Sequence, residues 1–350
     1  MNRGFWAKLP KPFFCLAPLA DVTDAAFRRL IAKYGKPDVL WTEFVSADGL
    51  AHPVGRKKLL PLLQFSAAER PIVAQLFGAR PEKMFAAARL VAELGFDGLD
   101  LNFGCPDRAV EKQGAGAALI KNPKLARELI QAAGEGSASR RMPISVKTRL
   151  GYNLDELENW LLVLLAEPLA AVTIHARTRK EMSKVPARWE RIKRAVEIRG
   201  QLKSQTLIIG NGDVMNLAEA RERAAQSGAD GVMLGRAIFG NPWLFANLAR
   251  AKSHKVVGRE FPSSAVSRQR LCDSSPRDQR PCGPPFRERL RTLGEHLQLF
   301  DELLGGVKSF AVMKKHFKAY LPEKSLRLKL MATNSAAEAE QIITAALKNG

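Results

Sequence analysis

The sequence predicts an α/β fold, a (β/α)8 TIM barrel followed by a small C-terminal helical domain. Between about residue 13 and residue 250, short apolar or β-branched runs alternate with longer amphipathic stretches. Near-continuous apolar strands between helices are typical of a parallel sheet covered on both faces. Eight such units fit a closed barrel better than an open doubly wound sheet. At the end of the chain a helical period returns without strands.

The expected strands are short and rich in Val, Ile, Leu and Phe, as buried parallel strands are. In chain order they cover residues 13–17, 39–44, 72–77, 98–102, 144–148, 171–175, 207–210 and 231–235. Amphipathic helices are expected between them, for example over residues 81–94 and 217–227.

Composition divides the chain into three parts. Residues 1–251 form the expected barrel domain. Residues 252–287 are rich in Ser, Pro and Arg, and they predict a flexible linker or insertion that cannot bury enough apolar surface to fold. Residues 288–350 predict a basic helical domain, which begins with an apolar stripe at i, i+3 and i+4 spacing. The stripe consists of Leu290, Leu293, Leu297, Phe300 and Leu304.

The net charge of +20 and the pI near 10.1 indicate a polyanionic partner, nucleic acid first and an anionic membrane surface second. A generically basic protein is the alternative. The chain contains two basic tracts: one follows the strand at 171–175, and the other lies within residues 307–330. Together they predict a clamp on an RNA backbone, for which we expect Arg179, Lys180, Lys314, Lys315 and Lys318 to contact phosphates. The alternative is a solvated basic face on packed helices.

Cysteine usage and hydropathy bear on the compartment. No apolar run approaches the ~20 residues that a membrane helix needs, and the first residues lack the apolar core of a signal peptide. The four cysteines include no CxxC pair, which fits a reducing cytoplasm. No metal site is expected, and for Cys272 and Cys282, within residues 252–287, an incidental role is favoured over a metal or disulfide role.

Polar and small residues gather at the carboxyl ends of the expected strands, where the active site of such a barrel lies. They are Ala17, Pro18, Leu19, Glu43, Gln75, Asn102, Cys105, Lys147, Arg149, His175, Arg177, Asn211, Gly212, Asp213, Gly235 and Arg236. Glycine lets a backbone approach a ligand closely, and the loops after the last two strands of a barrel commonly bind phosphate. Gly212, Gly235 and Arg236 therefore predict a phosphate-bearing cofactor or substrate.

Two further residues at the mouth point to chemistry. Lys147 is expected to enter the barrel, where an ammonium is costly unless it meets an anion such as the N1–C2 region of a reduced flavin. The alternative is a salt bridge to Asp100. Cys105 lies between Gly104 and Pro106 on a tight loop, where a protonated thiol can act as an acid. The alternative is a small buried apolar side chain.

The motifs that carry these residues resemble the tRNA-dihydrouridine synthases, in order, from residue 13 to about residue 250. The most specific are Asn102-Phe103-Gly104-Cys105-Pro106 and Ile174-His175-Ala176-Arg177-Thr178. The segments 14–19, 42–44, 75–78, 114–119 and 146–151 and the glycine turns at 212 and 235 add to the resemblance. The C-terminal helical part resembles the family's tRNA-binding domain more loosely, chiefly at residues 313–316.

The resemblance implies an FMN enzyme that uses NADPH to reduce uridine in tRNA. FMN would be held by Ala17, Pro18, Leu19, Gln75, Lys147, His175, Asn211, Gly212, Asp213, Gly235 and Arg236. The flavin would deliver hydride to C6 of the uracil and Cys105 a proton to C5. Asn102 and Arg149 would hold the uracil carbonyls, with Glu43 and Arg177 near the base. A flipped D-loop uridine, a cytoplasmic location and a monomer are the accompanying expectations.

Two departures from the family pattern stand out. Leu19 occupies a position where the family commonly has methionine, a volume-conserving change, and residues 252–287 are longer than the usual connection between the domains. Two other functions compete: an FMN barrel that acts on a free pyrimidine, as dihydroorotate dehydrogenases do, and an RNA-binding scaffold without activity. The basic tracts argue against the first. Lys147, Cys105 and His175 at three strand ends argue against the second.

Overall fold

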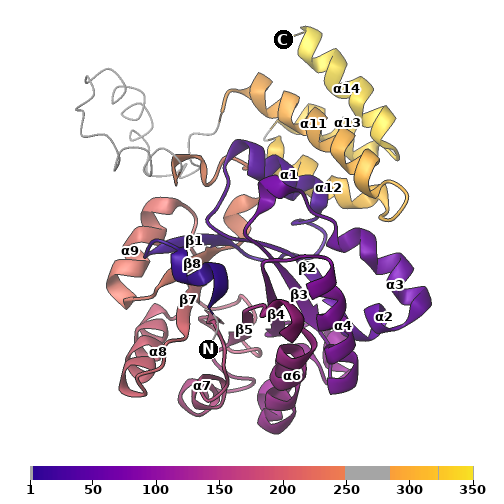
Figure 1. The fold of residues 1–350 in the computed structure, drawn as a ribbon. Helices are drawn as coiled ribbons and strands as arrows, with labels where there is room; N and C mark the ends of the chain where they lie inside the picture. Colours follow the sequence, from indigo (N-terminus) through magenta and orange to yellow (C-terminus); the bar gives the residue numbers. More distant parts are fainter. Residues whose placement is uncertain (1–2, 249–283, 322, 350) are drawn as a thin grey trace. The chain divides into compact units, whose positions relative to one another are not determined.

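The computed structural model describes residues 3–248, 284–321 and 323–349, and its first part is a parallel barrel (Figure 1). The strands are β1 (Phe13–Leu16), β2 (Leu40–Ser46), β3 (Ile72–Phe77), β4 (Gly98–Phe103), β5 (Ile144–Arg149), β6 (Ala171–His175), β7 (Leu207–Asn211) and β8 (Gly231–Leu234). Their order is β1-β8-β7-β6-β5-β4-β3-β2. A parallel bridge between Cys15 and Val39 joins β1 to the β2 side and closes the ring.

Helices surround the sheet on its outside (Figure 1). They are α1 (Ala25–Tyr34), α2 (Ala47–Ala51), α3 (Pro53–Leu59), α4 (Pro81–Glu93), α5 (Arg108–Glu111), α6 (Pro123–Gly136), α7 (Leu157–Leu165), α8 (Trp189–Gln201) and α9 (Leu217–Ser227). The predicted barrel is confirmed. The predicted strands at 72–77 and 171–175 coincide with β3 and β6, and the others differ only at their ends.

The amino-terminal end of the barrel is filled by a buried aromatic cluster. The 3-10 helix η1 (Gly4–Lys8) brings Trp6 against Phe13 and Trp41, with both pairs of ring centroids 5.8 Å apart. All three side chains are buried within the main core. Burial of such large rings is a major source of folding free energy. This plug closes one end of the barrel, so that a ligand site is left at the carboxyl ends of the strands.

The chain splits into two compact units, Met1–Arg29 with Pro37–Ile238, and Leu30–Lys36 with Phe239–Gly350. The second unit contains α11 (Phe286–Leu304), α12 (Met313–Tyr320), α13 (Lys324–Ala332) and α14 (Ala336–Asn349). The whole predicted apolar stripe of α11 is buried. The last turn of α1 belongs to this unit: Lys33 Nζ and Tyr34 Oη both contact the Glu295 carboxylate at 2.6 Å.

The predicted three-part division remains a prediction. Its boundary at residue 251 and most of residues 252–287, including Cys272 and Cys282, lie outside the described residues. Among the helices of the described ranges, none has the length and hydropathy needed to cross a membrane.

Candidate active site

A cavity of about 350 Å³ opens at the carboxyl ends of the strands, within the range of cofactor sites. Each of the eight strands, or the loop that follows it, contributes to the wall. The structure brings together these residues predicted from the sequence: Ala17, Pro18, Leu19, Gln75, Asn102, Cys105, Lys147, Arg149, His175, Arg177, Asn211, Gly212, Asp213, Gly235 and Arg236. Glu43 is not among the lining residues, and Phe44 lines the cavity from β2.

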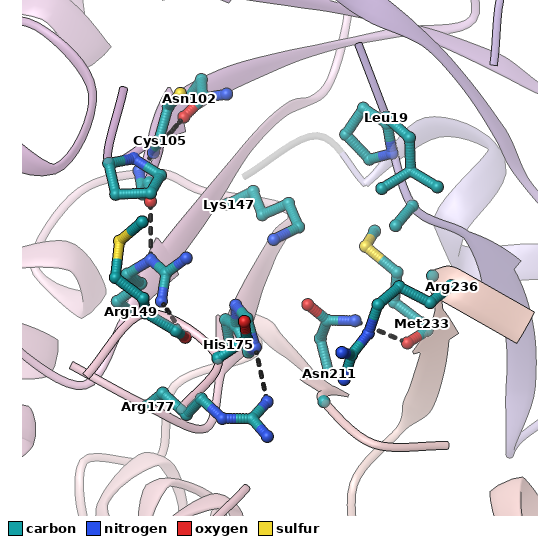
Figure 2. Close-up of a pocket in the computed structure, with 18 of the residues that line it drawn as sticks. Leu19, Asn102, Cys105, Lys147, Arg149, His175, Arg177, Asn211, Met233 and Arg236 are labelled. Carbon is teal, nitrogen blue, oxygen red and sulfur yellow. Dashed lines mark hydrogen bonds between the residues drawn. The ribbon is translucent and has the colours of Figure 1, made fainter. Parts of the chain in front are cut away.

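Strand register sets the layers of this site. Asn102 of β4 pairs with Lys147 of β5, so the two lie side by side. One step further along, Arg149 pairs with His175, and His175 with Asn211. In Figure 2, Lys147 extends into the middle of the cavity, with Asn102 and Cys105 on one side and Leu19 and Arg236 on the other.

Lys147 carries a positive charge that the described residues leave without a close acceptor. No hydrogen bond or ion pair to its ammonium is found in those ranges, and both oxygens of Asp100 accept from Gln75 Nε2 and Ser145 Oγ at 2.6 Å. The salt bridge between Lys147 and Asp100, which was the alternative, therefore does not form. Burial, together with the charge of Arg149, lowers the pKa of Lys147 to about 8. An anion in the cavity would reverse that shift.

His175 is a neutral imidazole at physiological pH. Burial, and then the surrounding charges of Lys147, Arg149 and Arg177, lower its pKa well below the usual value. Its Nε2 lies 3.1 Å from Arg177 Nη1. A guanidinium only donates, so Nε2 is the acceptor and the ring proton lies on Nδ1.

The turns after β7 and β8 each contain a glycine, and the two glycines differ in their surroundings. At Gly212, φ is +129°, and a Cβ would lie 2.8 Å from the Ala187 Cβ, so that only glycine fits without strain. At Gly235 a Cβ would meet nothing nearer than the Ala17 Cβ at 3.8 Å. Glycine there leaves open a space that a side chain would fill. This space at Gly235, beside Arg236, suits a phosphate group.

Asp213 orients cations at this edge of the cavity. Its carboxylate accepts from Arg177 Nη2, from Arg236 Nη2 at 2.8 Å and from the Ala187 N–H at 2.8 Å. Burial acts to raise the pKa of Asp213, but the hydrogen bonds from Arg177 and Ala187 outweigh it and the pKa is lowered. A carboxylate repels phosphate, so Asp213 serves the predicted anion site by holding Arg236.

The Cys105 loop is fixed by backbone contacts. Asn102 Oδ1 accepts from the N–H groups of Gly104 and Cys105, at 3.2 and 2.9 Å, and the Ala117 N–H donates to the Cys105 carbonyl at 3.0 Å. Cys105 lines the cavity and is half-buried, unlike Cys15, which is fully buried in the core. Burial raises the pKa of Cys105, so the thiol keeps its proton at neutral pH, as an acid must.

Three residues expected near the substrate are engaged within the protein. Arg149 donates to the carbonyls of Gly104, Thr178 and Met182 through Nε and Nη1, which leaves Nη2 for a ligand. Arg177 uses all of its nitrogens, on the Val185 carbonyl, His175 and Asp213. Buried Glu43 accepts from the Asp21 N–H at 2.5 Å. The geometry favours a bracing role for Arg177 and Glu43 over contact with a base.

Ion pairs divide the basic tract after β6 into two kinds of residue. Its arginines are paired: Arg177 with Asp213, Arg179 with Glu111, Arg188 with Glu181, Arg191 with Asp155, and Arg194 with Glu158. Lys180, Lys184 and Lys193 are exposed and form no ion pair in the described ranges. Arg179 is therefore less available to phosphate than predicted. In the second unit, Lys315 and Lys318 are exposed on α12 and Lys314 is half-buried.

A basic group on α3 was not predicted from the sequence. Arg56, Lys57 and Lys58 are exposed on this helix, which buries none of its residues. No carboxylate of the described ranges pairs with them. The helix comes after α2 in the connection that leaves the carboxyl end of β2. The three consecutive cations are visible in the sequence. Only the structure shows that, unlike the arginines after β6, they have no acidic partners in the described residues.

A closed parallel barrel with a lysine and a thiol in the cavity at the carboxyl ends of its strands places the protein in the class of TIM-barrel enzymes. The family model "Dihydrouridine synthase (Dus)" matches residues 15–349. A "Probable tRNA-dihydrouridine synthase" of Staphylococcus aureus (strain COL) is 37% identical over 349 residues, 98% of this chain and 95% of that protein. This chain belongs to the dihydrouridine synthase family.

Further comparisons agree with this assignment. The "Probable tRNA-dihydrouridine synthase 2" of Bacillus subtilis (strain 168) is 44% identical over 258 residues, 73% of this chain and 78% of that protein. Among solved structures, histamine dehydrogenase from Rhizobium sp. 4-9 aligns with a TM-score of 0.51 at 14% identity, covering 69% of this chain and 46% of the other. At that identity the likeness shows the barrel fold alone.

Proposed function

We propose that this enzyme reduces uridine to 5,6-dihydrouridine in tRNA, with FMN as cofactor and NADPH as reductant. The observation that carries the proposal is one cavity that contains both the lysine without an acceptor, Lys147, and the protonated thiol of Cys105. The names of the relatives supply the substrate, tRNA. A D-loop uridine, a monomeric enzyme and a cytoplasmic location belong to the same proposal.

The residues of the cavity fit FMN. The Lys147 ammonium suits the electron-rich N1–C2 edge of the ring, the open space at Gly235 with Arg236 suits the phosphate, and Gln75 and Asn211 supply amide groups. Ala17, Pro18 and Leu19 give an apolar wall, His175 a neutral donor, and Gly212 and Asp213 the turn that supports Arg236. A bound flavin supplies the hydride that reduces the C5–C6 double bond of uracil.

The chain's own residues then orient the base and move one proton. Asn102 and the remaining Nη2 of Arg149 donate to the uracil carbonyl oxygens, where negative charge develops during reduction. The Cys105 thiol gives its proton to C5. Because a stacked base cannot enter such a cavity, the uridine must be extruded from the tRNA first. Contact of Glu43 or Arg177 with the base is not part of the proposal, since both side chains are engaged elsewhere.

Binding of the tRNA backbone is assigned chiefly to lysines. Lys180 on the barrel and Lys314, Lys315 and Lys318 on α12 contact phosphates, and Arg179 contributes less because Glu111 neutralises its charge. Such contacts select the RNA by its shape and charge, and the cavity selects the base.

The experiment is a map of dihydrouridine in tRNA from cells with and without this protein. Loss of dihydrouridine at defined D-loop positions, restored by the wild-type gene but not by Cys105→Ala, is the expected result. An unchanged map would overturn the tRNA substrate. A purified protein that holds no flavin would overturn the cofactor.

A further inference from the structure

Asp100 is a buried carboxylate that none of the roles above uses. It lies in β4 inside the barrel with its side chain fully buried, and no cation of the described ranges forms an ion pair with it. Gln75 Nε2 and Ser145 Oγ donate to its two oxygens at 2.6 Å. Burial raises the pKa of Asp100 to about 6, so that it is largely ionised at neutral pH. The nearby charge of Lys147 favours the ionised form, but both hydrogen bonds to the carboxylate come from neutral side chains. Burial of such a charge is costly, which calls for a function.

The carboxylate fixes the orientation of two amides in series. An ionised carboxylate only accepts hydrogen bonds, so Gln75 must turn its NH2 group toward Asp100. Gln75 Oε1 then faces Asn102 and accepts from Asn102 Nδ2 at 3.0 Å. Asn102 Oδ1 is in turn left to accept the backbone N–H of Cys105 at 2.9 Å. Each link has one allowed polarity: Asp100 enforces it at one end, and the backbone N–H groups of Gly104 and Cys105, which only donate, enforce it at the other.

The same chain of bonds decides what the cavity wall offers a ligand. Gln75 and Asn102 both line the cavity, and each NH2 group has a second hydrogen that the described contacts do not use. With the orientation that Asp100 imposes, both amides offer N–H donors. Inverted amides would instead offer carbonyl oxygens, which repel the carbonyl groups of a uracil or a flavin.

We infer that Asp100 is a positioning residue: it holds the Gln75 and Asn102 amides with their N–H groups toward the cavity and, through Asn102, fixes the Cys105 loop. The inference rests on the proposed function for the purpose of this arrangement. The arrangement itself is a property of the protein alone. Asp100 acts only through its neighbours and touches no reacting atom.

The test compares Asp100→Asn with Ser145→Ala. Asp100→Asn keeps the shape of the side chain but allows either end of the new amide to meet Gln75, so the orientation of Gln75 is no longer enforced from this end of the series. Ser145→Ala removes the other hydrogen bond of Asp100 and leaves its contact with Gln75 in place. It is the matched control, because a role limited to core stability would respond to both changes.

Two measurements separate positioning from stability. In the flavin-loaded enzyme, Asp100→Asn is expected to lower kcat for dihydrouridine formation by about tenfold or more, with the KM for tRNA within about twofold of wild type. In flavin-free protein, alkylation of Cys105 by iodoacetamide, followed by peptide mass spectrometry, is expected to accelerate about fivefold, because a loosened loop exposes the thiol. Ser145→Ala should stay within about twofold of wild type in both measurements.

Kinetics and alkylation in Asp100→Asn that both match wild type would overturn the inference. Should this variant fail to fold, the double variant Asp100→Asn with Gln75→Glu replaces it. The amide introduced at position 100 then donates to the carboxylate introduced at position 75, which still accepts from Asn102. Wild-type alkylation of Cys105 in the double variant supports the inference, and fast alkylation overturns it. A wild-type enzyme that makes no dihydrouridine would instead defeat the proposed function, and the alkylation result would still decide this inference.

Discussion

Lys147 and Asn102 lie side by side on paired strands, β5 and β4, and line the same cavity. The Asn102 amide is held by hydrogen bonds, whereas the Lys147 ammonium, among the described residues, is not. Asn102 is held on three sides, by Gln75 and by the backbone of Gly104 and Cys105. Lys147 has no close acceptor in the described part of the chain. One wall of the cavity is therefore preorganised, whereas its central charge is left for a bound anion.

Replacement of Lys147 tests whether its ammonium binds the flavin. Lys147→Met is expected to weaken flavin binding by about tenfold or more, which corresponds to about 1.4 kcal/mol. The melting temperature of the flavin-free protein should not fall, because the change removes a buried charge whose desolvation outweighs the attraction of Asp100. Titration of the flavin-free protein with FMN measures the affinity, and thermal unfolding of the same protein measures its melting temperature. Lys203→Met, at an exposed position, is the control, and equal affinity in the two variants would contradict the assignment.

Flavin affinity should depend on pH through the same residue. In the free enzyme the pKa of Lys147 is about 8; the ammonium is present below this pH and is lost above it. The affinity for FMN is therefore greatest below pH 8 and falls as the pH rises through that value. Lys147→Met should show no such fall. A fall of the same size in the variant would assign the titration to another group.

Removal of the Cys105 thiol should separate binding from turnover. Cys105→Ala is expected to retain flavin and tRNA while dihydrouridine formation drops by about 10²- to 10⁴-fold, the usual contribution of a general acid. Reduction of the flavin by NADPH should be almost unchanged. Cys15→Ala, at the buried cysteine of the core, should lower stability with turnover retained. Comparable turnover in the two variants would leave the thiol without a role as acid.

Arg177 is expected to act as a brace. Arg177→Met removes contacts to His175, Asp213 and the Val185 carbonyl, whereas Asp213 keeps its bonds from Arg236 and Ala187. We expect a loss of about 1 to 3 kcal/mol in the free energy of unfolding, as for acceptors that lose a charged donor, together with weaker flavin binding. Arg194→Met breaks exposed ion pairs and should leave stability almost unchanged, because solvent screens such pairs. Chemical denaturation measures both, and a fully stable Arg177→Met would contradict the bracing role.

The basic group on α3 predicts a contact with the RNA backbone. Charge reversal of Lys57 and Lys58 to glutamate should raise the KM for tRNA several-fold and flatten the dependence of binding on salt concentration. Lys203→Glu, in the loop between α8 and β7 and so at the amino-terminal end of the barrel, should do neither. Oxidation of NADPH without tRNA should be equal in all these proteins. An unchanged salt dependence in the α3 variant would count against the contact.

The fold and most of the cavity were predictable because their signals are local. Alternation of apolar runs and helices defines the barrel, and in a parallel barrel every strand end points to the same mouth, so that Cys105, Lys147 and His175 were expected to meet. Pairing across long sequence distances was not predictable. Phe44 rather than Glu43 lines the cavity, and the pairing of β2 with β3 contains a register shift just before Phe44 that the sequence does not reveal. The partners of Arg177 and Arg179 are 36 and 68 residues away.

The relay from Asp100 to Cys105 was missed for the same reason. From the sequence, Asp100 is expected only as a salt-bridge partner of Lys147, because the two side chains have opposite charges. Nothing local indicates that Ser145 and Gln75 donate the hydrogen bonds to its carboxylate instead. The orientation of an amide is decided by its neighbours in three dimensions, and it therefore leaves no pattern in the chain.

The central claim is that this cavity reduces a uridine of tRNA with the help of the Cys105 proton. The most direct measurement incubates purified enzyme with NADPH and an unmodified tRNA transcript, and counts dihydrouridine by mass spectrometry after a single turnover. Wild-type protein is expected to form it, while Cys105→Ala, with its flavin fully reduced, forms almost none in the same time. Equal formation by the two proteins, or none by wild type with its flavin reduced, would contradict the account.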